Sequence, residues 1–202
     1  MNMNQYADMR DAIFEEIYGL AQKDKKIIIL SADNGAAIFK KFQENIPAQF
    51  YNVGIAEQNA MSVAAGLALT GRRVFVVGIA NFVTLRCFEQ IRNDIAMMNL
   101  PVTILASGTG YFYGEDGPTH HMTDNLTIMR TLPNFTFWCP SSFQMAASLI
   151  HEAYKEKGPN CIWFDRGPFY PLGEHYDEDF SKGVNVIKSG HDAIIVSFGI
   201  MV

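Results

Sequence analysis

The chain has 202 residues, of which 49% are hydrophobic, and carries a formal net charge of −5. This length and apolar content fit one globular domain with a short additional piece, and they exclude a disordered chain. The acidic balance, without a basic stripe, argues against nucleic-acid binding. No apolar run approaches the length of a membrane span, and residues 1–6 lack the features of a signal peptide. The three cysteines form no CxxC pair, so we expect reduced thiols in a cytoplasmic protein.

Continuous apolar runs alternate with amphipathic stretches along the chain. Runs rich in β-branched residues predict buried parallel strands, and apolar residues at helical spacing predict helices. Ser141 is expected to cap the last helix, which stops at Gly158 and Pro159. In chain order, we expect a helix over 10–22, a strand over 26–31, a loop over 33–36, a strand over 50–53, a helix over 56–70, a strand over 73–78, a helix over 83–98, strands over 102–107 and 135–139, a helix over 141–157 and a strand over 161–164.

This βα rhythm predicts an α/β fold, a doubly wound, mostly parallel sheet with helices on both faces. In such sheets ligands bind at the carboxyl ends of the strands. The loops at Asp33, 52–57, 78–82 and 108–121 would therefore gather at one edge of the sheet.

The last part of the chain differs from this rhythm. Residues 167–190 have a mixed composition with prolines and an acidic patch, which is typical of a surface connector. The apolar run over 193–198 predicts a buried strand, but a single strand cannot bury itself. Either it joins the edge of the main sheet, or it opens a further domain. We favour the second, and expect a main domain over 1–166, followed over 167–202 by a connector and the first strand of a further domain that is otherwise absent.

Two motifs carry the chemistry of the sequence. The stretch 114–121, Gly-Glu-Asp-Gly-Pro-Thr-His-His, places two carboxylates and two imidazoles between glycines and a proline, and an aromatic run over 111–113 precedes it. Upstream, Glu57 opens an apolar helix, where it would be partly desolvated and able to share a proton. An acid at a helix start is also a simple partner of the helix dipole.

Adjacent histidines such as His120 and His121 can also belong to a metal site or to a solvated loop. A metal site needs further ligands at suitable geometry. The remaining histidines, His151, His175 and His191, are not spaced to supply them. We therefore expect no metal site formed by this chain.

Together, the loop over 114–121 and the Ala-Glu-Gln-Asn segment over 56–59 resemble the transketolase family of thiamine diphosphate enzymes. The resemblance extends over about 8–202 and concerns the domain of the thiamine diphosphate-binding fold that holds the aminopyrimidine ring. It implies that Glu57 hydrogen-bonds a ring nitrogen and stabilises the imino tautomer, which then deprotonates the thiazolium carbon.

The resemblance also implies a cofactor pocket formed by Glu57, Phe82, Ile79 and Asp33. Phe82 would stack on the pyrimidine ring, although an aromatic side chain at such a loop is more often part of the core. Ile79 and Leu85 stand where transketolases often have further aromatic residues, so the pocket is less aromatic or a neighbouring chain contributes to it.

For the substrate, the resemblance implies that Asp116 hydrogen-bonds a sugar hydroxyl and that His120 contacts the reacting oxygens and moves protons. Arg10 and Arg166 fall where transketolases bind the substrate's phosphate, which suits the planar guanidinium fork. Each is otherwise an ordinary surface charge. Gly108 stands where transketolases often have a further phosphate-contacting histidine.

The family's other cofactor-binding domain holds Mg²⁺ and the diphosphate through a Gly-Asp-Gly motif, which this sequence lacks. The resemblance therefore implies the C-terminal half of a split transketolase, which transfers a two-carbon ketol unit between sugar phosphates and is inactive alone. It would need an N-terminal-half subunit, which holds most of the Mg²⁺ site, and would form a homo- or hetero-oligomer.

Three alternatives remain open from the sequence. Deoxyxylulose-phosphate synthases share the fold but use an Asp-Gly-x-Thr-His loop, and Glu115 and Pro118 favour transketolase over them. The beta subunits of 2-oxoacid dehydrogenases share the fold and the glutamate but lack the loop. A non-catalytic pairing subunit is the third, and the presence of Glu57 argues against it.

Overall fold

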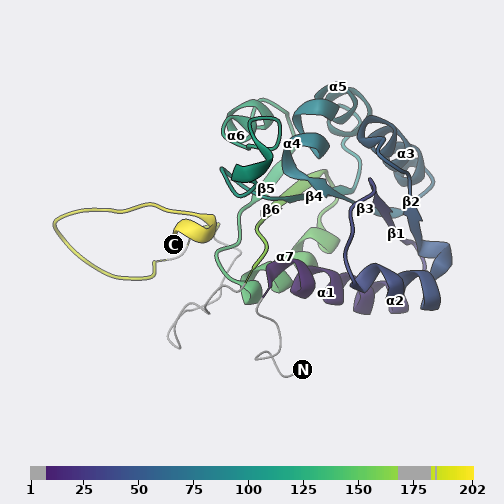
Figure 1. Ribbon diagram of the computed structural model, residues 1–202, viewed down its shortest axis with the longest axis horizontal. Coiled ribbons are helices and arrows are strands. Elements are labelled where there is room, and N and C mark those ends of the chain that lie inside the picture. Colours follow the sequence, from purple (N-terminus) through teal and green to yellow (C-terminus); the bar gives the residue numbers. More distant parts are fainter. Residues whose placement is uncertain (1–7, 168–182, 185) are drawn as a thin grey trace.

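The computed structural model describes residues 8–167, 183–184 and 186–202. Within them, one six-stranded sheet has the order β2-β1-β3-β4-β6-β5, and all of its neighbouring strands pair in parallel (Figure 1). The strands are β1 (Ile27–Ser31), β2 (Phe50–Asn52), β3 (Arg73–Ile79), β4 (Val102–Ser107), β5 (Thr136–Trp138) and β6 (Asn160–Phe164). This confirms the predicted α/β fold with a parallel sheet.

Helices cover both faces of the sheet, which confirms the doubly wound prediction. In Figure 1, α1, α2 and α7 lie below the sheet and α3, α4, α5 and α6 lie above it. The helices are α1 (Met9–Lys23), α2 (Ile38–Asn45), α3 (Glu57–Leu69), α4 (Ala80–Val83), α5 (Phe88–Gln90), α6 (Asn125–Met129) and α7 (Phe143–Lys155).

The central strands divide their side chains between two cores. Successive residues of a strand point to opposite faces. Accordingly, Val74 and Val76 of β3 pack in the cluster that includes α3, while Phe75 and Val77 pack in the cluster that includes α1 and α7. Because both faces are covered, all five residues of β1 are buried, which explains its continuous apolar sequence.

The expected helix over 83–98 is instead broken into several short pieces. After α4 come a 3₁₀ turn over Leu85–Cys87, then α5, and then a π-helical segment over Ile91–Ala96. The break lies at Thr84, whose backbone leaves the helical region at φ −119° and ψ −80°. The Thr84 hydroxyl donates a hydrogen bond to the Ala80 carbonyl oxygen at 2.6 Å, a local bond of the kind that competes with the helical ladder.

Two other helical details differ from the sequence-based expectation. The N-cap of α7 is Ser142 rather than Ser141, because the Ser142 hydroxyl accepts the hydrogen bond from the Met145 N–H at 3.1 Å. The short helices α2 and α6 were not expected. α2 forms because Phe39 and Phe42, three residues apart, reach the core on one helical face.

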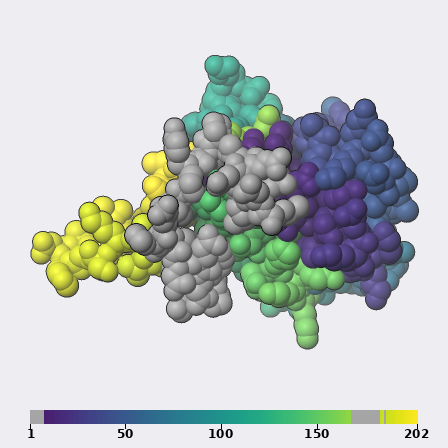
Figure 2. All heavy atoms as spheres, turned by 90° about the horizontal axis from the view of Figure 1, so that it is seen from below, coloured from purple at the N-terminus to yellow at the C-terminus, as the bar shows by residue number. Residues whose placement is uncertain are grey.

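Residues 193–198, expected as a strand, take no strand conformation in this chain. Their side chains have no sheet to pack on, and Ile194 and Ile195 are each 91% exposed. The described residues from 183 onwards, which include this segment, extend to one side of the molecule (Figure 2, yellow). The expected connector lies largely over 168–182, outside the described residues, so the division into two domains stays a prediction. No helix of the described chain is long and apolar enough to cross a membrane.

Candidate functional site

The loop between β2 and α3 brings Glu57 to the carboxyl edge of the sheet. Gly54 adopts φ +75°, a conformation that favours glycine, and Asn52 fixes the turn by accepting a hydrogen bond from the Gly54 N–H at 2.9 Å. The Asn52 amide also exchanges two hydrogen bonds with Asp33, each of 3.1 Å. Asp33, a predicted cofactor residue, therefore lies against the loop that leads to Glu57.

Glu57 is the first residue of α3 and is only 5% exposed. A buried carboxylate needs a partner, and it is also stabilised by the positive end of the helix dipole. The partner found among the described residues is Arg86, whose Nη1 donates a hydrogen bond to Glu57 Oε2 at 3.0 Å. The pair is unequal, because the Arg86 side chain remains 43% exposed while that of Glu57 is 6% exposed.

A continuous row of side chains extends from this ion pair. The Arg86 guanidinium lies over the face of Phe82, with Cζ 4.0 Å from the ring centroid. Phe82 also meets His120 edge to face, with 4.8 Å between the ring centroids. The structure thus brings three predicted site residues, Glu57, Phe82 and His120, into one row with Arg86, which we call the Glu57–His120 row.

His120 is oriented by its own loop. Thr119 Oγ1 lies at hydrogen-bond distance from His120 Nδ1, at 3.1 Å, and Asn81 donates a hydrogen bond to the Thr119 carbonyl oxygen at 2.7 Å. Asn81 is a neighbour of Phe82 in α4. The same short helix therefore places the aromatic ring and holds the histidine loop against it.

Tyr113 fills the space at Gly108. The backbone of Gly108 has φ +89°, and an added Cβ would lie 2.1 Å from Cε2 of the Tyr113 ring. The Tyr113 hydroxyl lies 3.3 Å from Ser107 Oγ, which ties the loop back to the end of β4. A ring therefore occupies the space beside the position where transketolases often have a histidine.

Asp116 and Ile79 also lie at the carboxyl edge of the sheet, but the structure gives less support for their predicted roles. Asp116 ends the 3₁₀ turn Gly114–Asp116 and is exposed. Ile79 ends β3 and precedes α4, and it is half-buried. Within the described part of the chain, the Asp116 side chain makes no hydrogen bond to the Glu57–His120 row, and the aliphatic side chain of Ile79 has no group that could make one. The roles of both residues stay predictions.

The two arginines predicted to bind phosphate lie on segments that Asp8 joins. Asp8 accepts a hydrogen bond from the Arg10 N–H at 2.8 Å and one from the Gly167 N–H, beside Arg166, at 3.0 Å. The Arg10 side chain is largely buried and pairs with Asp11 at 3.1 Å, whereas Arg166 is exposed. The structure thus joins the two segments without placing either guanidinium on the row.

Two functional candidates were missed from the sequence. Arg86 follows Phe82 by four residues, a spacing that would have placed both on one face of a regular helix. Asp165, just after β6, accepts two hydrogen bonds of 2.6 Å from the Thr109 N–H and hydroxyl, and so anchors the loop that carries His120. Burial raises the pKa of the Asp165 carboxyl, and the hydrogen bonds from Thr109 oppose that rise.

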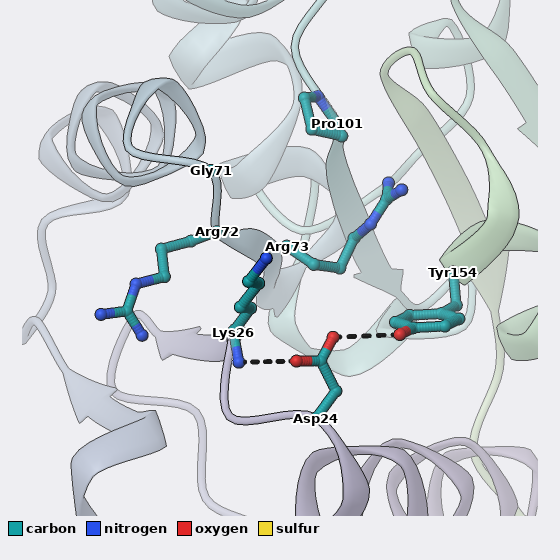
Figure 3. Close-up of a pocket in the computed structure, with 7 residues that line it drawn as sticks. All are labelled: Asp24, Lys26, Gly71, Arg72, Arg73, Pro101 and Tyr154. Atoms are coloured by element: carbon teal, nitrogen blue, oxygen red, sulfur yellow. Dashed lines mark hydrogen bonds between the residues drawn. The ribbon is translucent and has the colours of Figure 1, made fainter.

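A separate pocket of about 310 Å³ lies at the opposite, amino end of the strands (Figure 3). Its lining includes Lys26 and Arg72, just before β1 and β3. Asp24 also lines it, and its carboxylate accepts hydrogen bonds from the Lys26 N–H and the Tyr154 hydroxyl. Ligands of such sheets bind at the carboxyl ends of the strands, where the Glu57–His120 row lies and this pocket does not. Among the described residues, no cluster of three or more potential ligands could hold a metal ion.

The sequence matches known proteins along most of its length. Residues 5–170 match the family described as the transketolase pyrimidine-binding domain. A Methanocaldococcus jannaschii protein named "Putative transketolase C-terminal section" is 33% identical over 96% of this chain and 62% of its own length. An apulose-4-phosphate transketolase subunit of Phocaeicola vulgatus is 31% identical over 97% of this chain and 64% of its own. A 1-deoxy-D-xylulose-5-phosphate synthase of Carboxydothermus hydrogenoformans is 32% identical over 92% of this chain and 31% of its own.

Solved structures agree with this match. The structure titled "Split gene transketolase, inactive beta4 tetramer" superposes with a TM-score of 0.83 at 34% identity, over 96% of this chain and 63% of that one. A transketolase from Campylobacter jejuni has a TM-score of 0.79 at 20% identity, over 94% of this chain and 30% of that one, and so supports the fold alone. The chain therefore spans less than two thirds of the length of each of these relatives.

Proposed function

Because the chain belongs to the family of transketolase pyrimidine-binding domains, we propose that it is the C-terminal-half component of a transketolase. In this proposal it transfers a two-carbon ketol unit between sugar phosphates together with an N-terminal-half subunit. The observation that carries the proposal is the buried carboxylate of Glu57 at the start of α3, in one row with Phe82 and His120. The relatives named as a split-gene transketolase and as a transketolase subunit support the need for a partner.

The residues of the row fit the aminopyrimidine ring of thiamine diphosphate. The ring needs a carboxyl group at one nitrogen and an apolar face to stack on, and Glu57 and Phe82 supply both at the carboxyl edge of the sheet. When bound, thiamine diphosphate supplies a nucleophilic carbon that the twenty amino acids lack. Ile79 and Asp33 border the same edge and complete the proposed pocket.

Each side chain of the site has one task in the proposed mechanism. Glu57 would hold a proton on its carboxyl group and share it with a nitrogen of the bound ring. His120 moves protons at the reacting oxygens of the sugar. Asp116 accepts a hydrogen bond from a sugar hydroxyl, while Arg10 and Arg166 receive the phosphate.

The partner half would hold Mg²⁺ and the diphosphate and would cover the edge of the sheet beside the row. The loop there exposes aromatic surface, since Tyr111 is 70% exposed and Phe112 is 37% exposed. Contiguous exposed apolar surface of this kind is typical of interaction sites. We therefore expect the chain to form a homo- or hetero-oligomer through this edge.

A deoxyxylulose-phosphate synthase activity is the second candidate. Several relatives of that name are 32–34% identical to this chain, as close as the transketolase sections are. Glu115 and Pro118 of the loop favour transketolase. A non-catalytic pairing role is the third candidate, and the presence of Glu57 argues against it.

One experiment separates these functions. The chain is co-expressed with the product of the adjacent open reading frame, as the candidate N-terminal half, and the purified complex is supplied with thiamine diphosphate and Mg²⁺. Ketol transfer between sugar phosphates supports the proposal. Formation of 1-deoxy-D-xylulose 5-phosphate without ketol transfer would favour the second candidate. A complex that binds no cofactor and catalyses neither reaction would support the pairing role.

A further inference from the structure

We infer that Arg86 competes with the cofactor's aminopyrimidine ring for Glu57 and Phe82, so that the ring can bind only when the guanidinium leaves. This inference rests on the proposed function and concerns a residue that the sequence analysis did not single out. It depends on two contacts of one planar group. Arg86 Nη1 donates to Glu57 Oε2 at 3.0 Å, and the guanidinium carbon lies 4.0 Å from the centroid of Phe82.

A guanidinium and an aminopyrimidine present similar surfaces to a protein. Both are flat and delocalised, both stack on an aromatic face, and both direct polar atoms outward in the plane of the group. In the proposed function, the pyrimidine ring needs the face of Phe82 and the carboxyl group of Glu57. The Arg86 guanidinium already makes both contacts. Two flat groups cannot occupy the same face of Phe82 and the same carboxylate together.

The burial of the pair shows which partner can move. The Glu57 side chain is 6% exposed and fixed at the start of α3, whereas that of Arg86 is 43% exposed. Arg86 also lies in the short 3₁₀ turn Leu85–Cys87, beyond the helix break at Thr84. Its guanidinium can therefore reach solvent by rotating its own long side chain, while the backbone of α3 stays in place.

The contact with Arg86 also explains how the fold tolerates the buried Glu57 carboxylate before the cofactor binds. A buried carboxylate without a partner destabilises a fold strongly. Arg86 satisfies Glu57 before the cofactor binds by donating to its carboxylate. The ring nitrogen afterwards pairs with the same carboxyl group, which then carries the proton of the new hydrogen bond. Arg86 thus occupies the site in part of the molecules. Only the remaining fraction can bind the ring, so the apparent affinity for the ring is lowered.

The test measures binding of the cofactor's aminopyrimidine fragment, without thiazolium or diphosphate, to the full chain by NMR titration. Arg86→Met keeps the length of the side chain but removes its charge and its planar fork. We expect it to bind the fragment about ten-fold more tightly than the unmodified chain, because the competitor is gone. Arg92→Met, at an exposed arginine farther along the same region, is the matched control and should leave the affinity unchanged.

A second variant keeps the test valid if Arg86→Met does not fold. Arg86→Lys retains a charge for Glu57 but lacks the flat face that stacks on Phe82. We expect its affinity for the fragment to lie between those of the unmodified chain and Arg86→Met. In the unmodified chain, the NMR signal of the Arg86 Nε–H should move as the fragment binds. An unchanged or weaker affinity in both variants, or a fixed Arg86 signal, would overturn the inference.

Failure of this inference can be told apart from failure of the proposed function. The complex with the N-terminal half is titrated with thiamine diphosphate itself, by calorimetry. If the complex binds the cofactor but Arg86→Lys and Arg86→Met have no effect on affinity, the inference fails and the function stands. If the unmodified complex binds no thiamine diphosphate, the proposed function fails, and the inference fails with it.

Discussion

The two helical layers of this chain differ in regularity. The regular layer contributes mainly to stability, and the irregular layer contains the candidate functional site. The layer of α1, α2 and α7 consists of continuous helices, and its core is rich in aromatic contacts such as Phe14 with Phe39 at 4.9 Å. The layer of α3 to α6 has one continuous helix of 13 residues, α3, but the rest of it is divided into short pieces, among them a 3₁₀ turn and a π-helical segment. The Glu57–His120 row belongs entirely to the second layer and its loops. Breaks in helices are known to gather at functional sites, and here the break at Thr84 turns Arg86 back towards Glu57.

The largest expected effect concerns Glu57 in the assembled enzyme. Glu57→Gln keeps the size of the side chain but removes the proton that it shares. We expect hydrogen–deuterium exchange at the thiazolium carbon, followed by NMR, to slow by roughly 100- to 10,000-fold. Cofactor affinity should change far less, because in the proposed function the partner half holds the diphosphate.

The matched control is the same substitution at a glutamate in the layer of α1, α2 and α7. Glu15 of α1 pairs with Lys41 at 2.7 Å and is also partly buried. Glu15→Gln should leave the exchange rate unchanged. If Glu57→Gln exchanges as fast as the unmodified enzyme, the role assigned to Glu57 is wrong.

The second prediction compares one phenylalanine from each layer. Phe14 is 1% exposed, and Phe14→Ala should lower the free energy of unfolding by about 3–5 kcal/mol through the cavity it leaves. Phe82 is only half-buried, so Phe82→Ala should cost about 1 kcal/mol, while binding of the aminopyrimidine fragment is lost. Urea denaturation measures both costs. Equal costs for the two variants would remove the contrast between the layers.

The third prediction concerns alkaline pH and the second layer, whose core contains the cysteines. Burial raises the pKa of the Cys87 and Cys139 thiols from 9.0 to about 12. Between these values the folded chain keeps protons that the unfolded chain has lost. Stability is therefore fully present below pH 9 and falls as the pH rises towards 12, by about 1.4 kcal/mol per pH unit for each thiol.

Replacement of a thiol tests the origin of that slope. Cys87→Ala removes one titrating group, so its unfolding free energy should fall less steeply between pH 9 and 12 than that of the unmodified chain. The measurement is a series of urea denaturation curves across this range. Parallel pH profiles for the two chains would show that the Cys87 thiol ionises equally in the folded and unfolded states.

The smallest expected effect lies at the start of α7, in the regular layer. Ser142→Ala removes the hydroxyl that accepts from the Met145 N–H and should cost about 1 kcal/mol of stability. Ser141→Ala, one residue earlier, should cost close to nothing. Thermal unfolding of the two variants distinguishes them, and a reversed order would place the cap at Ser141 after all.

The regular parts of the molecule could be predicted from sequence because they follow simple periodicities. The apolar residues of the β-branched run before Ser31 are all buried only in a central strand. The apolar residues at helical spacing in α1 share one face only in a helix. The gathering of Glu57, Phe82 and His120 followed from the rule that loops after parallel strands meet at one edge. The resemblance to a known family then assigned them roles.

What could not be predicted depends on contacts between distant residues. The helix break at Thr84 comes from one hydroxyl, and sequence periodicity carries no signal for it. Asp165 and Thr109 are far apart in the chain and meet only because β4 and β6 are neighbours in the sheet. Residues 193–198 take no strand conformation in this chain for a related reason, since a strand depends on its neighbours as well as on its own residues, and their place in a further domain stays a prediction.

The packing of Tyr113 against Gly108 limits which substitutions this part of the site can accept. A histidine cannot be introduced at Gly108 by a single change, because its Cβ would meet the Tyr113 ring and its backbone would be strained at φ +89°. A sequence with glycine and tyrosine is therefore separated from one with histidine by at least two coupled replacements. Engineers who wish to transplant a phosphate-binding histidine here must replace Gly108 and Tyr113 together.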